Sequence, residues 1–328
     1  MEQTEKQQID GKKARVALLS IASNTLLTST KVLVGLLSGS VSILSEGIHS
    51  GLDLLAAGIA FFAVKQSAKP ADADHTYGHG KIENISGTIE ALLILVAVIM
   101  IVMEAVKKLI LIMRGDSGEL SGMALGLGLA VMGGSALVNI FVSSRLMKTA
   151  QETDSVALEA DALHLRTDVY TSSGVFAGLL LIKLTGWYIL DPIIALGVAL
   201  IILKAAYELT GKAFFPLVDV SLPETEQEII SDVLSRYEDK FVEFHNLRTR
   251  KAGAERHIDL HLVVAKNLSV EKVHELCDLI ENDIGARLKG TQALIHVEPC
   301  SVAGVICPVN NGVTEICQRC RGVKQQAE

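Results

Sequence analysis

Cysteine is absent from this 328-residue sequence before position 277, and the cysteines that follow are Cys277, Cys300, Cys307, Cys317 and Cys320. An odd number crowded at one end does not fit a disulfide framework. An excess of basic residues is also missing: the formal net charge is −7, which argues against a nucleic-acid partner, because such proteins present a basic patch. No HExxH motif occurs, so a membrane metalloenzyme of the zinc-protease type is remote.

Apolar residues, by contrast, are abundant and unevenly placed. They make up 49% of the chain, the mean hydropathy is +0.39, and they gather before about residue 215. A bilayer core requires about 20 apolar residues per helix. Runs of this kind predict six membrane spans, at residues 16–38, 41–65, 82–112, 119–146, 156–183 and 188–210.

Basic residues predict the orientation of these spans. They gather at the N-terminus and after spans two, four and six, at Lys12, Lys13, Arg15, Lys65, Lys69, Lys81, Arg145, Lys148 and Lys212. The positive-inside rule then places both termini in the cytoplasm of a cell whose inner (plasma) membrane holds the chain. Residues 1–15 are polar and show no cleavable signal pattern, so we expect a cytoplasmic segment there.

Charges appear throughout the sequence after about residue 215 and predict a soluble domain, whose start we place at residue 211. Helical and alternating patterns indicate a helix at 223–237, strands at 241–250 and 256–264, a helix at 269–288 and a strand at 293–297. The predicted fold is an all-α six-span transmembrane domain (16–210) followed by a small α+β cytoplasmic domain (211–300). A cysteine-containing tail (301–328) completes the chain.

Two histidine–aspartate pairs stand inside the predicted membrane spans. His49 and Asp53 lie four residues apart in span two, and His164 and Asp168 repeat that spacing in span five. Residues at this spacing share one helical face, and ionisable groups at membrane depth indicate a functional site. Together the pairs supply four nitrogen and oxygen ligands, which suit Zn²⁺. The alternative is structural, with each aspartate only orienting its histidine.

A second group of metal-binding residue types follows span two. Asp72, His75 and His79 combine two histidines at i,i+4 with a nearby aspartate, and they either chelate a metal or are incidental in a solvated loop.

These motifs resemble those of the cation diffusion facilitators. The resemblance rests on His49-x3-Asp53, on the segment from Pro70 to Lys81, on His164-x3-Asp168, on Phe244–Arg250 and on His296–Cys300. It implies a homodimeric six-span exporter of divalent metals with a metallochaperone-like (ferredoxin-like) cytoplasmic domain. Such a protein is a metal/proton antiporter, not an enzyme, and its partners are a divalent metal ion, protons and the lipid bilayer. Histidine at position 49 resembles the zinc-selective members; Fe²⁺, Co²⁺, Cd²⁺ and Mn²⁺ are alternative cargoes, and a membrane-anchored metal sensor is a rival function.

The same resemblance implies roles for further residues. It assigns a binuclear cytoplasmic metal site to His245, His261, His274, His296 and Glu298. His261 would bridge, with His245 and Glu298 on one ion and His274 and His296 on the other. His257 shares a strand face with His261 but is expected to be exposed. Lys81 resembles a lysine of a charge interlock at the dimer's membrane surface, with Asp219 as its expected partner.

The C-terminal tail departs from the family pattern. Cys307, Cys317 and Cys320, together with Cys300, either form an additional thiolate zinc site or belong to a redox-sensitive or disordered tail. The role of Glu46, one turn before His49, stays open between a proton carrier, a residue that supports the metal ligands, and a pore-facing structural carboxylate.

Overall fold

The protein forms two compact units, Met1–Leu217 and Val218–Glu328. The computed structural model describes the backbone of residues 2–38, 41–114, 122–185, 187 and 189–300. Side chains are described over the same ranges except at 2–6, 35, 38, 41–49, 52, 122–132, 172, 175–184 and 191.

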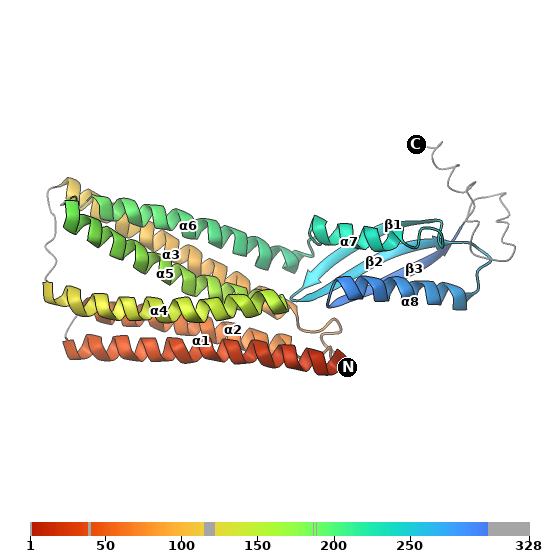
Figure 1. The fold of residues 1–328 in the computed structure, drawn as a ribbon, viewed down its shortest axis with the longest axis horizontal. Helices are drawn as coiled ribbons and strands as arrows, with labels where there is room; N and C mark the ends of the chain where they lie inside the picture. Colours follow the sequence, from red (N-terminus) through yellow and green to blue (C-terminus); the bar gives the residue numbers. More distant parts are fainter. Residues whose placement is uncertain (1, 39–40, 115–121, 186, 188, 301–328) are drawn as a thin grey trace. The chain divides into compact units, whose positions relative to one another are not determined.

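Six long helices build the first unit (Figure 1). They are α1 (Glu2–Ser38), α2 (Val41–Ser67), α3 (Lys81–Met113), α4 (Gly122–Thr153), α5 (Val156–Thr185) and α6 (Leu190–Phe214), followed by the short 3₁₀ helix η1 (Phe215–Val218). Within the described residues, three segments are long and apolar enough to cross a membrane by length and composition: Gln7–Val34, Lys81–Met113 and Pro192–Val218.

Two buried cores hold the helices together, and α5 contributes to both. One core packs α1, α2 and α4 against α5 and includes Ala17, Val64, Leu146 and Leu158. The other packs α3 and α6 against α5 and includes Ile94, Ala160, Ile202 and Leu209. Because α5 carries one of the predicted ligand pairs, its central position brings that pair toward residues of the other helices.

Close helix approach in the second core depends on a glycine. Gly87 on α3 lies where a Cβ atom would come 2.9 Å from Val156 Cγ1 and 3.1 Å from Ala213 Cβ. No side chain of ordinary size fits at that distance without a shift of the neighbouring helices.

The first helix extends beyond the apolar run that predicts span one. That span was placed at 16–38, whereas α1 begins at Glu2. Glutamate, glutamine and lysine, which occupy eight of the first 13 positions, are good helix formers but have low hydropathy. Hydropathy therefore detects the part of the helix that can lie in the membrane and misses its polar extension.

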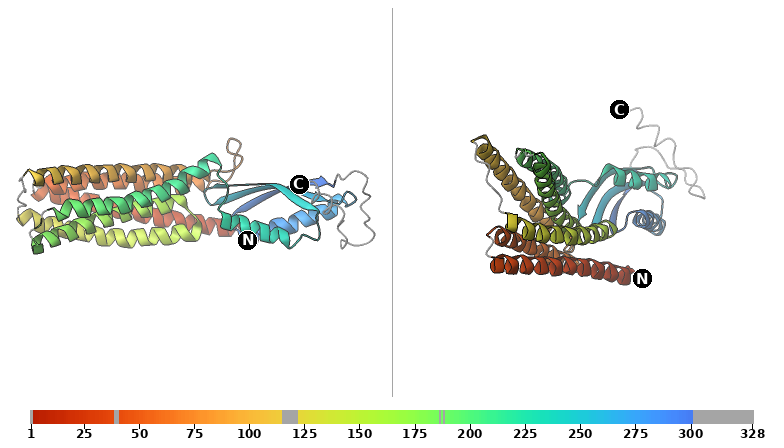
Figure 2. Two further views of the ribbon diagram at one scale, coloured as in Figure 1. Left: turned by 90° about the horizontal axis from the view of Figure 1, so that it is seen from above. Right: turned by 60° about the vertical axis from the view of Figure 1, so that its left-hand side comes forward.

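The second unit is a three-stranded sheet with two helices on one face (Figure 2). Its elements are α7 (Glu224–Ser235), β1 (Glu243–Ala252), β2 (Glu255–Val264), α8 (Val270–Arg287) and β3 (Thr291–Pro299). The strand order is β1-β2-β3, with β1 and β2 antiparallel and β2 and β3 parallel. The helix–strand–strand–helix–strand order and the predicted fold class are confirmed.

Local signals in the sequence explain these elements. The Ser269 hydroxyl caps α8 by accepting the Lys272 N–H, and Gly253 (φ 61°) occupies the left-handed position of the turn between β1 and β2. Alternate residues of β2 (Ile258, Leu260 and Leu262) enter the core beneath α7 and α8. The opposite face of the sheet therefore carries the intervening residues, His261 among them.

Candidate metal sites

A buried group of potential metal ligands lies inside the helical unit. Asp53 on α2 and His164 on α5 are 5% and 9% exposed, and His164 Nε2 is 3.2 Å from Asp53 Oδ1. Asp168 joins them, so that one ligand atom from each residue lies within 4.8 Å of the others. Buried ionisable groups without hydrogen bonds or a partner ion are costly, and a shared cation would offset that cost.

Helix geometry explains how this group forms. His164 and Asp168 are neighbours on one face of α5 because they are four residues apart, and α2 packs against α5. On α2, His49 occupies the turn before Asp53. The side chains of His49 and Glu46 lie outside the described residues, so His49 stays a predicted fourth ligand.

The loop between α2 and α3 brings together Asp72, His75 and His79. Asp72 Oδ1 accepts the His75 backbone N–H at 2.7 Å and lies 3.2 Å from His75 Nδ1, while Asp72 Oδ2 is 3.4 Å from His79 Nε2. The two imidazole rings are 4.4 Å apart. The hydrogen bond from the His75 N–H lowers the pKa of Asp72, which keeps an ionised carboxylate available to a metal ion.

The sheet of the second unit aligns three histidines across neighbouring strands. His245 on β1 is paired with His261 on β2, and His261 is paired with His296 on β3. The ring centroids are 5.3 Å apart for His245–His261 and 4.8 Å apart for His261–His296. An irregularity in the β1 register between His245 and Arg248 adjoins this row, in a position where bulges commonly re-aim a side chain.

Glu298 completes this cluster. Its carboxylate lies 2.8 Å from His261 Nδ1, 3.5 Å from His245 Nε2 and 4.0 Å from His296 Nε2. His245, His261 and Glu298 offer ligand atoms within 4.8 Å of one another. The hydrogen bond with His261 lowers the pKa of Glu298, and the nearby imidazoles act in the same direction.

His274 does not join the cluster within a single chain. It lies on α8, which packs on the other face of the sheet; its side chain is 75% exposed and its Nδ1 is 3.6 Å from Asp278 Oδ1. The structure thus brings together four of the five residues assigned by resemblance, His245, His261, His296 and Glu298. The role of His274 stays a prediction.

The expected exposure of His257 is wrong, because its side chain is only 6% exposed. β2 is the middle strand, so His257 lies between its sheet partners Arg250 and Gln292, whose side chains flank it on the same face.

Lys81 and Asp219, the expected partners of a charge interlock, belong to different units. Their pairing stays a prediction. Within its own unit, Lys81 Nζ donates to the Leu217 carbonyl at 3.4 Å. Arg250 Nη1 lies 3.4 Å from Asp219 Oδ1 in the other unit.

The structure describes two of the five cysteines. Cys307, Cys317 and Cys320 lie outside the described residues, so the tail site stays a prediction. Cys277 and Cys300 are buried, and neither forms a disulfide with a described residue. Burial raises the pKa of Cys277 to about 11, which leaves it a protonated thiol at neutral pH and a poor metal ligand.

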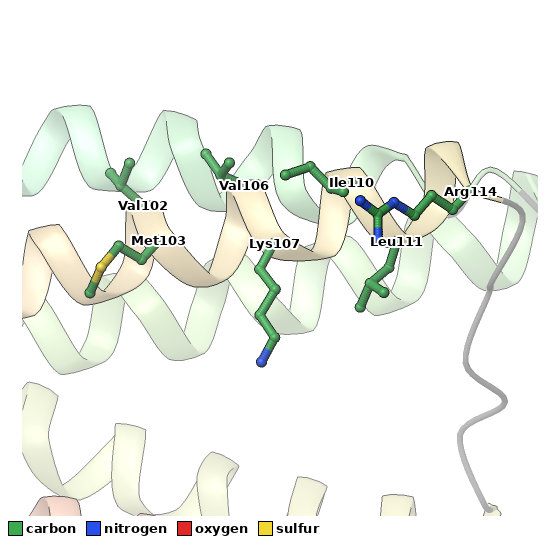
Figure 3. A pocket seen from close by; sticks show the side chains of 7 residues that line it. All are labelled: Val102, Met103, Val106, Lys107, Ile110, Leu111 and Arg114. Carbon is green, nitrogen blue, oxygen red and sulfur yellow. The ribbon is translucent and has the colours of Figure 1, made fainter.

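A hollow along α3 offers no metal ligand of the usual types (Figure 3). The side chains that line it come from this helix and its C-cap residue, and they are Val102, Met103, Val106, Lys107, Ile110, Leu111 and Arg114. Two cations and five apolar residues would repel a divalent metal, so the metal chemistry of the described residues lies in the three clusters above.

Three buried acids were missed by the interpretation of the sequence. Glu83, Glu90 and Asp161 are no more than 1% exposed. Each lies in or beside a predicted span, and charged residues in apolar runs are the signal that identified the histidine–aspartate pairs. Applied without regard to spacing, that signal identifies these acids too.

Together, a membrane helix bundle with an internal ligand cluster and a separate α+β unit with a histidine–carboxylate cluster define a multi-pass membrane transporter of metal cations. Residues 17–218 match the family model described as the cation efflux transmembrane domain, and residues 222–300 match the cation efflux protein cytoplasmic domain. The chain belongs to the cation efflux family. It is a transporter of divalent metal cations and not an enzyme.

Similar proteins cover most of the chain. An uncharacterized transporter of Synechocystis sp. is 37% identical over 86% of this chain and 89% of its own length. The cation-efflux pump FieF of Salmonella paratyphi A is 30% identical over 88% of this chain and 93% of its own length.

Solved structures of C-terminal domains match a smaller part. A Zn form of the transporter CzrB is 39% identical over 25% of this chain and 92% of that chain, with a TM-score of 0.24. The metal-bound C-terminal domain of CzcD from Thermotoga maritima is 29% identical over 24% of this chain and 94% of that one, with a TM-score of 0.22.

Proposed function

We propose that this protein exports Zn²⁺ from the cytoplasm in exchange for protons, as a homodimer in the plasma membrane with both termini in the cytoplasm. The observation that carries the proposal is the buried cluster of Asp53, His164 and Asp168, which joins two different helices. A site shared by α2 and α5 changes its access when these helices move against each other, as alternating access requires.

The ligand types favour zinc as the cargo. Neutral imidazole and carboxylate suit Zn²⁺ better than Cu⁺, which prefers thiolates, or Ca²⁺, which prefers an all-oxygen cage. His49 would supply the fourth ligand of a tetrahedral site. Fe²⁺, Co²⁺, Cd²⁺ and Mn²⁺ are the competing cargoes that a transport assay compares directly.

Proton exchange follows from the chemistry of the same ligands. Histidine binds a metal only as the neutral imidazole, and its reference pKa of about 6.5 lies close to physiological pH. Metal and protons therefore compete for the site, and a site that opens alternately to each side exchanges one for the other.

Metal flux into proteoliposomes tests this function. With an acid interior, we expect Zn²⁺ uptake that collapses when the pH gradient is removed. Loss of a residue that only supports a metal ligand costs about 10–100-fold in metal affinity or activity. Asp168→Asn removes a proposed ligand itself and should lower uptake by at least that factor.

The matched control is Glu208→Gln, because Glu208 is an exposed acid on α6 that pairs with Lys204 at 3.8 Å. This control should keep full uptake. Undiminished uptake by Asp168→Asn would remove the assignment of the site, and metal binding without any flux would favour a membrane-anchored sensor.

A further inference from the structure

Two carboxylates outside the three metal-binding clusters lie buried on α3 and α5, which pack against each other inside the helix bundle. Glu90 on α3 is 0% exposed and Asp161 on α5 is 1% exposed. They repel each other electrostatically, and their neighbours Ala91 and Ala160 pack in the same core. Among the described residues, no oxygen atom of either carboxylate has a hydrogen-bond partner.

The uncharged polar groups that act on this pair are two hydroxyls. Ser86, one turn before Glu90, and Ser20 on α1 face the two carboxylates, without meeting hydrogen-bond geometry with them. The Ser86 hydroxyl is itself buried and has no partner among the described residues. Neutral donors of this kind can accommodate a protonated carboxyl group but do not balance two negative charges.

The described cations on α1, α2 and α6 are engaged elsewhere or exposed. On α1, Lys13 Nζ donates to Glu83 and Lys31 Nζ donates to Ser50. On α6, Lys204 is exposed beside Glu208 and Lys212 pairs with Glu159. On α2, Lys65 is exposed.

Two residues of the proposed transport site, Asp53 and His164, interact electrostatically with Asp161.

Physical chemistry then limits the charge of the pair. Two ionised carboxylates in a water-free interior cost several kcal/mol per ion and repel each other as well, so the pair keeps at least one proton when no other cation is near. A dication at the transport site changes that balance. Asp161 lies one helical turn before His164, and residues at this spacing are about 5–6 Å apart at Cβ.

We propose that Glu90 and Asp161 form a proton-binding pair, separate from the metal ligands, that carries a proton in the exchange for metal. Metal binding from the cytoplasm stabilises the ionised pair, one O–H bond breaks, and the proton passes to water. After the metal leaves on the other side, a carboxylate takes a proton from water there. This inference rests on the proposed proton exchange and assigns one of its carriers.

Infrared difference spectroscopy of the full-length protein tests the pair directly. We expect Zn²⁺ addition to the wild type to remove a band of a neutral carboxylic acid and to add carboxylate bands. Glu90→Gln should abolish that change. The control Glu104→Gln, an exposed acid on the same helix, should leave it intact. A wild-type spectrum in which Zn²⁺ removes no neutral carboxyl band would overturn the inference, even if the variant does not fold.

Proton counting provides a second readout. In weakly buffered solution, Glu90→Gln and, separately, Asp161→Asn should release fewer protons per bound Zn²⁺ than the wild type, by about one. Unchanged release with intact Zn²⁺ binding would contradict the proposal. Wild-type flux that ignores the pH gradient would instead contradict proton exchange itself, so the two failures are distinguishable.

Discussion

His261 lies at the centre of the cytoplasmic cluster because its strand is the middle one of the sheet. β2 pairs with β1 on one side and with β3 on the other, so His261 meets both His245 and His296 directly. Its Nδ1 also approaches Glu298 at 2.8 Å. The spacing of these residues in the sequence does not reveal this arrangement, whereas the strand register produces it.

We expect His261→Gln to weaken Zn²⁺ binding at this cluster more than substitution of the neighbouring residues does. Loss of a supporting contact to a metal ligand already costs about 10–100-fold in affinity, and loss of a ligand should cost at least as much. Competition with a metal-sensitive dye measures the effect. Asp259→Asn is the control, because Asp259 lies on the same face of β2 two residues earlier; an equal loss in both variants would contradict the assignment.

The lowered pKa of Glu298 makes a prediction about pH. A carboxylate whose pKa is lowered in the folded protein stays ionised as the pH falls, and its contribution is lost only below its ordinary range of about 4.3. Protons compete with metal ions for histidine ligands in general, so metal binding should weaken as the pH falls from about 7.5 to about 5.5.

Glu298→Gln should therefore bind Zn²⁺ more weakly at every pH of this window but with the same pH slope as the wild type. Isothermal titration at several pH values measures both quantities. A shallower slope in the variant would mean that Glu298 itself titrates in this window.

At the scale of elements, Glu83 ties four segments together at the start of α3. Its Oε1 accepts hydrogen bonds from Lys13 Nζ on α1 and from Ser67 Oγ at the end of α2, both at 3.0 Å. Its Oε2 accepts the Ser155 hydroxyl, between α4 and α5, at 2.6 Å. Lys13 and Glu83 are both buried, so each ion depends on the other.

We expect Glu83→Gln to lower the free energy of unfolding by about 3–5 kcal/mol, because it leaves the buried Lys13 ammonium without its counterion. Denaturant unfolding in detergent measures this change. Glu152→Gln is the control: Glu152 pairs with Lys12 at an exposed position, where an ion pair contributes little to stability. Similar losses in the two variants would show that burial of the Lys13–Glu83 pair is unimportant.

The limits of sequence interpretation also appear at the scale of elements. Apolar runs predicted six long helices in the first unit, and alternation predicted three strands in the second, because hydrophobic periodicity follows directly from helix and strand geometry. The polar start of α1 was missed, since a hydropathy pattern sees only the apolar part of a helix.

At the scale of the whole molecule, two units offer different environments to a metal ion. The cluster of Asp53, His164 and Asp168 is largely buried among helices, whereas His245, His261 and Glu298 are partly exposed on a sheet. The first suits a cargo that is carried through the bilayer. The second suits an ion that binds from the cytoplasm and stabilises the fold of the second unit.

Metal binding should therefore stabilise the second unit. A ligand at 100 times its dissociation constant adds about 2.7 kcal/mol to the stability of the folded state. Zn²⁺ at that concentration should slow amide exchange in β1, β2 and β3 by about 100-fold where exchange requires unfolding, and a chelator should reverse the change. Exchange in these strands that is the same with and without Zn²⁺ would contradict metal binding there.

The sequence by itself determined which residues are neighbours along one helix or strand. The pair His164–Asp168, the histidines of the loop and the alternation of β2 follow from fixed local geometry. Only the tertiary structure decided which groups meet across elements. It joins Asp53 to His164, aligns His261 with His245 and His296, and buries Glu90 and Asp161 within one helix bundle. Such contacts depend on helix packing and strand register, which are set by many side chains acting together and not by the spacing of any two.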